Sequence, residues 1–205
     1  MDIWPVVHSE RKALAADLKS CDEAQWSTQS LCGEWPVRNA LAHMTATAKM
    51  TPASFFPRLA SSGFRFATLQ ANGIAAQLGS SPADTLARFE AIINSTGRPP
   101  GPPATMLGEV LVHSEDIRRP LGLSHAFPTE VAVQVADFFK NSNLLIGSKR
   151  RIAGLTLRAT DTDWSHGSGP VVSGPIHTLV MAMTGRKAVL DDLSGDGVAT
   201  LRKRP

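Results

Sequence analysis

The sequence contains no tyrosine, so no tyrosine side chain is available as an acid or a base. It also has no G-x-S-x-G motif for acyl transfer, and its glycine-rich turns lack the lysine and hydroxyl of a phosphate loop. No apolar run is long enough to cross a bilayer. Residues 1–5 do not form the apolar segment of a secretory signal. We therefore expect a cytoplasmic protein with no membrane partner.

Cysteine is scarce, with only Cys21 and Cys32 in 205 residues. Neither has a second cysteine nearby at metal-binding spacing, so we interpret both as reduced thiols that pack against their neighbours. The excess of positive charge is small, with a formal net charge of +3, and the basic runs at 149–151 and 202–204 are short. Because no aromatic-interleaved basic stripe accompanies them, nucleic acid is not an expected partner.

Helical periodicity dominates the first part of the chain. Apolar residues recur at helical spacing in five segments, near residues 6–19, 36–48, 82–93, 106–118 and 129–146. Pro36 and Pro82 stand at the expected first positions of two helices. Proline is favoured there because the amide of a first helical residue has no acceptor within the helix. The pattern predicts a helical bundle over residues 1–148.

The period changes after Arg151. Leu155 and Leu157 alternate with polar neighbours, which predicts a half-buried strand. Further elements are predicted in the order strand, helix, strand, at residues 171–172, 174–185 and 198–201. We therefore expect a small α+β domain over residues 149–205.

Glu109 and His113 are the most informative pair of residues. They are four positions apart on a predicted helix, so they share a face beside an apolar stripe. A carboxylate and an imidazole against a core must be paired, hydrogen-bonded or bound to a ligand. His43, on the helix that begins at Pro36, offers a second imidazole. Two imidazoles and one carboxylate on facing helices suit a divalent metal with an open position, while a metal-free cluster of buried charges is the alternative.

Two longer segments stand out as motifs. Residues 26–44 contain the run LCGEWPVRNALAHM, and residues 108–122 read GEVLVHSEDIRRPLG. Both resemble motifs of the mycothiol-dependent maleylpyruvate isomerase family. Shorter segments of the tail resemble its C-terminal domain, at residues 159–164, 174–175, 184–186 and 193–197. The resemblance keeps the motifs in order and spans nearly the whole chain.

The resemblance implies a mainly α protein, a DinB-like up-and-down four-helix bundle followed by the small α+β domain. It also implies a zinc site formed by His43, Glu109 and His113, with mycothiol as the thiol cosubstrate. A thiol at the open metal position becomes a thiolate. Addition of the thiolate to an electrophilic small molecule gives cis–trans isomerisation if it leaves again, and S-transfer if it stays. Metal-dependent hydrolysis and non-catalytic binding of an apolar or lipid-like ligand between bundle and tail are the alternatives.

Two further residues have predicted roles at this site. Asp116 lies three positions after His113 and is a candidate to orient a ligand imidazole, or alternatively to pair with an arginine such as Arg38. In the resembled family the C-terminal domain helps to form the active-site cleft, so Arg186 is a candidate catalytic residue that binds a substrate carboxylate. The tail is short for a second domain, so a homodimer in which a second subunit completes the pocket is a further expectation.

Overall fold

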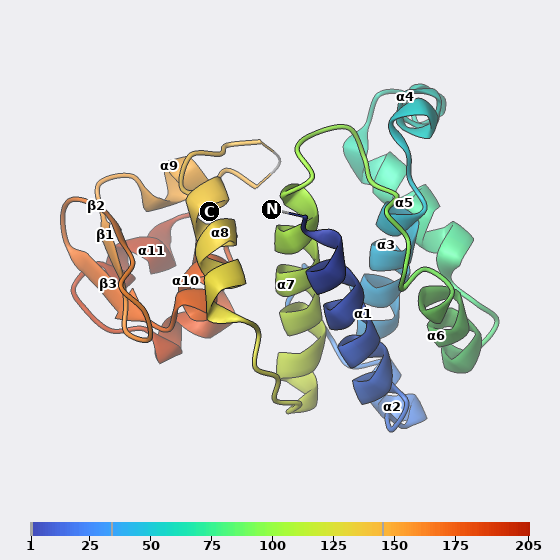
Figure 1. The fold of residues 1–205 in the computed structure, drawn as a ribbon, viewed down its shortest axis with the longest axis horizontal. Coiled ribbons are helices and arrows are strands. Elements are labelled where there is room, and N and C mark those ends of the chain that lie inside the picture. Colours follow the sequence, from blue (N-terminus) through green and yellow to red (C-terminus); the bar gives the residue numbers. More distant parts are fainter. Residues whose placement is uncertain (1, 34, 145) are drawn as a thin grey trace. The chain divides into compact units, whose positions relative to one another are not determined.

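The computed structural model describes residues 2–33, 35–144 and 146–205. The chain divides into two compact units, Met1–His125 and Ala126–Pro205, which are described here one at a time. In the first unit, four helices form a closed ring in which α1 contacts α6 and α7, and α3 contacts the same two helices (Figure 1). Their bounds are Trp4–Leu18 for α1, Val37–Ala48 for α3, Pro82–Glu90 for α6 and Thr105–Arg118 for α7.

Small and branched apolar residues explain why these helices pack closely. The α3 helix buries four alanines, and small side chains allow neighbouring helices to approach its axis. The α7 helix buries residues on most of its surface, including Val110, Leu111 and Ile117, as expected for a helix at the centre of a core. Truncation of such a fully buried leucine typically costs about 2–5 kcal/mol of stability.

Three other helices lie outside the ring of four. They are α2 (Glu23–Trp26), α4 (Pro52–Ser61) and α5 (Phe66–Gln77). The α5 helix packs on α3, and α4 contacts α5 but buries none of its own residues. A short 3-10 turn, η1 (Arg119–Leu121), follows α7 and ends at Gly122, whose φ of 68° suits glycine. The bundle core therefore lies between α1, α3, α6 and α7.

The second unit combines helices with a three-stranded sheet of order β2-β1-β3. Strand β1 pairs antiparallel with β2 and parallel with β3. Helix α10 packs against α8 and against the sheet. The bounds are Thr129–Phe139 for α8, Ser148–Ile152 for α9, Thr156–Ala159 for β1, Ser165–Gly167 for β2, Val171–Gly174 for β3, Ile176–Met183 for α10, Lys187–Asp192 for the 3-10 helix η2 and Val198–Lys203 for α11.

Three features of the second unit differ from the sequence-based expectation. Residues 198–203 form helix α11 rather than a strand, because the edge of β3 is already bridged by Ser194, which pairs with Ser173. Helix α8 ends at Phe139 instead of continuing to about residue 146. Because α8 packs on α10, the compact units divide after His125, whereas the predicted domains were residues 1–148 and 149–205.

None of the helices described here is long and apolar enough to span a membrane.

Candidate metal centre

His43 and His113 come together where α3 packs against α7. Their ring centroids are 4.9 Å apart and their planes meet at 76°. The Trp35 ring lies beside His43, and the two ring centroids are 4.8 Å apart. The two imidazoles predicted as ligands are therefore adjacent in the folded chain, with an indole beside one of them.

Glu109 lies one turn before His113 on α7. Both of its carboxylate oxygens are buried and accept no hydrogen bond from any residue that the structure describes. Burial raises the pKa of Glu109, and the nearby charges of His113 and Arg11 oppose that rise. A buried carboxylate without hydrogen-bond donors is costly, so its position calls for a cation or a proton.

Arg11 on α1 is the nearest candidate for a permanent counter-charge. It is fully buried, and its Nη1 donates to the carbonyls of Ile92 at 3.3 Å and Ser95 at 2.8 Å. Its Nε and Nη2 find no acceptor among the described residues. Burial lowers the pKa of Arg11 and the charge of Glu109 raises it. The two groups interact through their charges without a hydrogen bond, so Arg11 leaves the Glu109 oxygens available to a metal ion.

Asp116 contacts the Nδ1 atom of His113. The Oδ2 atom of this fully buried carboxylate accepts from Nδ1 at 3.0 Å. Burial lowers the pKa of His113, but its hydrogen bonds with Asp116 and Cys32 outweigh burial and raise that pKa to about 10. With such a pKa both ring nitrogens are protonated at neutral pH in the metal-free protein, so a metal ion would have to displace the Nε2 proton while Asp116 holds the proton on Nδ1. Arg38, the alternative partner of Asp116, instead bonds to Thr85 and Gly79.

Cys32 is the member of this group that the sequence reasoning missed. Its Sγ atom lies within 4.8 Å of ligand atoms of both His113 and Asp116, and it forms no disulfide. Two hydrogen bonds fix its loop, from Leu31 N to Asp116 O at 3.0 Å and from Cys32 N to the Ser30 hydroxyl at 3.1 Å. The sequence offered one signal, because Cys32 stands inside the motif that precedes His43.

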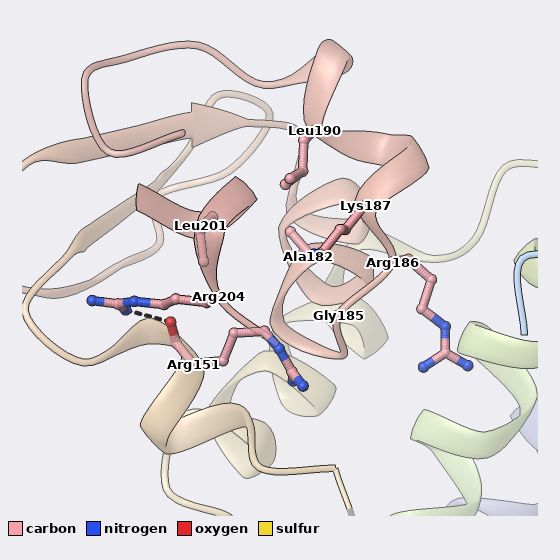
Figure 2. A pocket seen from close by; sticks show the side chains of 8 residues that line it. All are labelled: Arg151, Ala182, Gly185, Arg186, Lys187, Leu190, Leu201 and Arg204. Carbon is pink, nitrogen blue, oxygen red and sulfur yellow. Dashed lines mark hydrogen bonds between the residues drawn. The ribbon is translucent and has the colours of Figure 1, made fainter. Parts of the chain in front are cut away.

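Arg186 lies in the second unit, between α10 and the 3-10 helix η2. It lines a small hollow with Arg151 and Arg204, but Figure 2 shows its guanidinium pointing away from those two residues. The hollow has a water-accessible volume of about 10 Å³, about the room of one water molecule. Arg151 Nη1 is already bonded to the carbonyls of Ile146 and Met183. This hollow does not fit an organic substrate, and the catalytic role of Arg186 stays a prediction.

The donor set around His113 fits a divalent metal. The buried Glu109 oxygens lack hydrogen-bond donors, two imidazole rings meet edge to face, and Asp116 accepts a hydrogen bond from one of them. Nitrogen and oxygen donors of this kind suit zinc and similar divalent ions. Cys32, His113 and Asp116 form a second group of potential metal ligands, which also includes His113. In that group Asp116 and Nδ1 of His113 are already bonded to each other. Among the described residues, His43, Glu109 and His113 do not bring three donor atoms within 4.8 Å of one another, so their role as a ligand set stays a prediction.

The fold and these residues together define a helical-bundle protein whose core contains a cluster of potential metal ligands. The family model for the mycothiol maleylpyruvate isomerase N-terminal domain matches residues 7–118, more than half of the chain. The chain therefore belongs to the mycothiol maleylpyruvate isomerase family, an enzyme family, as the resemblance predicted.

Solved structures show the same fold over a longer stretch. The crystal structure of the mycothiol-dependent maleylpyruvate isomerase matches with a TM-score of 0.66 at 15% identity, covering 94% of this chain and 91% of that one. The structure of a histidine-to-alanine variant of that enzyme matches with a TM-score of 0.65 at 16% identity and the same coverage. The predicted DinB-like fold class is confirmed. A comparison with curated proteins gave no match.

Proposed function

We propose that this chain is a metal- and mycothiol-dependent enzyme that acts on a small electrophilic substrate. Its reaction is either a maleylpyruvate-type cis–trans isomerisation or S-transfer, in which the whole thiol adds to the substrate through its sulfur. The observation that carries the proposal is the buried Glu109 carboxylate, which has no hydrogen-bond donor among the described residues. It lies one turn before His113, whose ring meets that of His43 edge to face.

The proposed ligands are His43, Glu109 and His113, and zinc is the ion that we assign to them. When bound, the metal would lower the pKa of a thiol at its open position, so that the thiolate is available at neutral pH. Three protein ligands leave such a position open, as catalytic zinc sites require.

The protein residues have distinct roles in this proposal. Asp116 holds the Nδ1 proton of His113 and so keeps the lone pair of Nε2 directed to the centre. Trp35 packs its ring beside that of His43 and so restricts the orientation of the imidazole. Arg11 contributes a positive charge that offsets part of the negative charge of Glu109 without occupying the carboxylate oxygens.

The reaction itself is thiolate addition to an activated double bond. A sulfur–carbon bond forms while the π electrons move onto the conjugated carbonyl group, and the former double bond becomes a single bond. Rotation about that bond, followed by departure of the same thiolate, returns the double bond as the trans isomer. If a proton reaches the carbon first, the sulfur stays on the substrate and the outcome is S-transfer.

The test combines metal analysis with a thiol-dependent assay of the purified chain. We expect conversion of maleylpyruvate to its trans isomer only when both zinc and mycothiol are present, with loss on chelation and recovery when zinc is added back. His166→Ala serves as a control, because it removes a histidine on β2 that is not one of the proposed ligands. Turnover that needs the metal but no thiol would instead favour hydrolysis, and a chain that binds no divalent metal would refute the proposal.

A further inference from the structure

The corner formed by α4 and the start of α5, residues 49–66, exposes an unusual amount of aromatic surface. In the described ranges, four large apolar side chains are exposed, and three of them belong to this corner: Phe56 at 62%, Phe64 at 74% and Phe66 at 49%. Helix α4 contributes no buried residue to the core of the unit. Packing within the unit therefore does not account for the apolar side chains of α4, and exposed apolar surface of this kind is typical of an interaction site.

Two of the exposed rings, Phe56 and Phe66, are joined through Phe55. Phe55 lies 5.3 Å from Phe56 and 6.2 Å from Phe66, measured between ring centroids, so both ends of the corner share an aromatic cluster. Phe64, in the connecting turn, adopts a φ of 58°, a left-handed conformation that is strained for a phenylalanine. Its amide is fixed to the Leu59 carbonyl at 2.9 Å. The turn thus holds an aromatic side chain in solvent at a conformational cost.

The charge around these rings has one sign. Residues 35–83 contain no aspartate and no glutamate. Lys49, Arg58 and Arg65 are all exposed within the corner. The corner therefore carries exposed aromatic rings and three cations, of which Lys49 donates a hydrogen bond to Gln77 at 2.8 Å, and no carboxylate lies in this stretch of the sequence. This composition is complementary to an anionic, partly apolar surface.

We propose that the α4–α5 corner is a peripheral docking site for an anionic lipid bilayer. Phenylalanine rings bury in the boundary between headgroups and acyl chains, while lysine and arginine near them attract the acidic headgroups. A second copy of the chain fits less well, because a symmetric contact would bring Arg58 and Arg65 of both copies together without acidic partners. The contact is peripheral, since no described helix can span a membrane. The proposal is independent of the proposed function, and it differs from the sequence-based expectation of no membrane partner.

The experiment is co-sedimentation of the full chain with vesicles. We expect binding to vesicles of equal parts phosphatidylglycerol and phosphatidylcholine, weak binding to phosphatidylcholine alone, and release as salt is raised. Phe64→Asn should lower partitioning about tenfold, because a buried ring is lost while asparagine tolerates the left-handed backbone. Arg58→Gln and Arg65→Gln should each lower it about fivefold.

Leu144→Ser is the matched control, since Leu144 is 63% exposed but lies in the second unit. It should bind vesicles as the unaltered chain does. Equal binding by Phe64→Asn and the unaltered chain would overturn the proposal, as would the absence of binding to anionic vesicles. If light scattering instead finds a dimer that Phe64→Asn converts to a monomer, and vesicles bind neither form, the corner is a self-association surface and the proposal is wrong.

Discussion

The ring of His43 on α3 meets the ring of His113 on α7 edge to face, with centroids 4.9 Å apart. The two residues are 70 positions apart in the sequence, so the contact results from the packing of two helices. Two imidazoles this close in a partly buried core repel each other if both are charged. Once His113 has given up one proton, the two rings can instead share one cation, and the predictions below rest on this possibility.

Removal of either imidazole should remove the metal. We expect the unaltered chain to hold about one zinc ion, and His43→Ala and His113→Ala to hold less than about a tenth of that, because two ligands are too few for a stable site. Mass-spectrometric metal analysis after dialysis measures the difference. His166→Ala should retain the zinc of the unaltered chain. Full occupancy in His43→Ala would show that α3 contributes no ligand.

Glu109→Gln should separate metal binding from stability. Glutamine keeps the shape of the side chain but removes the buried carboxylate, so the metal-free variant should be no less stable to urea than the metal-free parent. Zinc at a hundred times its dissociation constant should stabilise the parent by about 2.7 kcal/mol and the variant hardly at all. A zinc-dependent stabilisation that persists in Glu109→Gln would remove this residue from the ligand set.

Asp116→Asn tests the orienting contact with His113. The substitution preserves size but removes the charge that accepts the Nδ1 proton at 3.0 Å. Loss of such a partner typically weakens metal affinity about 10–100-fold, so zinc titration should show a shift of that size with an unchanged far-ultraviolet circular dichroism spectrum. The exposed Asp196→Asn is the control. Unchanged affinity in Asp116→Asn would mean that the contact is only structural.

Binding of cobalt in place of zinc distinguishes the two candidate groups of ligands, one with His43 and Glu109 and the other with Cys32 and Asp116, which both include His113. If His43, Glu109 and His113 hold the ion, cobalt-loaded protein should lack a sulfur-to-cobalt charge-transfer band until a low-molecular-weight thiol is added. Cys32→Ser should then bind cobalt with an affinity within about threefold of the parent, since no ligand is lost. A charge-transfer band present without added thiol, and absent in Cys32→Ser, would make Cys32 a ligand.

Local pattern was sufficient to predict much of this molecule. The spacing of Glu109 and His113 places both on one helical face, and helix α7 indeed spans them. Strand β1 was predicted from the alternation around Leu157, and it forms with Leu157 fully buried. Such features depend on neighbours within a few residues, so the sequence displays them directly.

Features that depend on distant contacts were not predictable in this way. Cys32 reaches His113 because Leu31 bonds to the Asp116 carbonyl, a hydrogen bond between residues 85 positions apart, and no periodicity reports such a bond. Helix α11 was expected as a strand because the segment from Val198 to Leu201 is too short to establish a period. In both cases the missing information was which residues lie alongside the segment in the fold.

The second unit should show an acid-sensitive contribution to its stability from Asp137 on α8. Its Oδ1 atom accepts from Lys140 Nζ at 2.6 Å and from Trp164 Nε1 at 3.0 Å, and the Lys140 contact is the main reason that the pKa of Asp137 lies below its ordinary value. A depressed carboxyl pKa stabilises the fold above the ordinary aspartate pKa of about 4, and this stabilisation disappears as the pH falls through the lowered value. Because the carboxylate is 48% exposed, Asp137→Asn should cost no more than about 1 kcal/mol at pH 7.

Urea unfolding followed by tryptophan fluorescence should show that cost shrinking toward zero as the pH falls below about 4, with the exposed Asp163→Asn as control. A cost that stays the same at acid and neutral pH would mean that the charge of Asp137 is not what stabilises the unit.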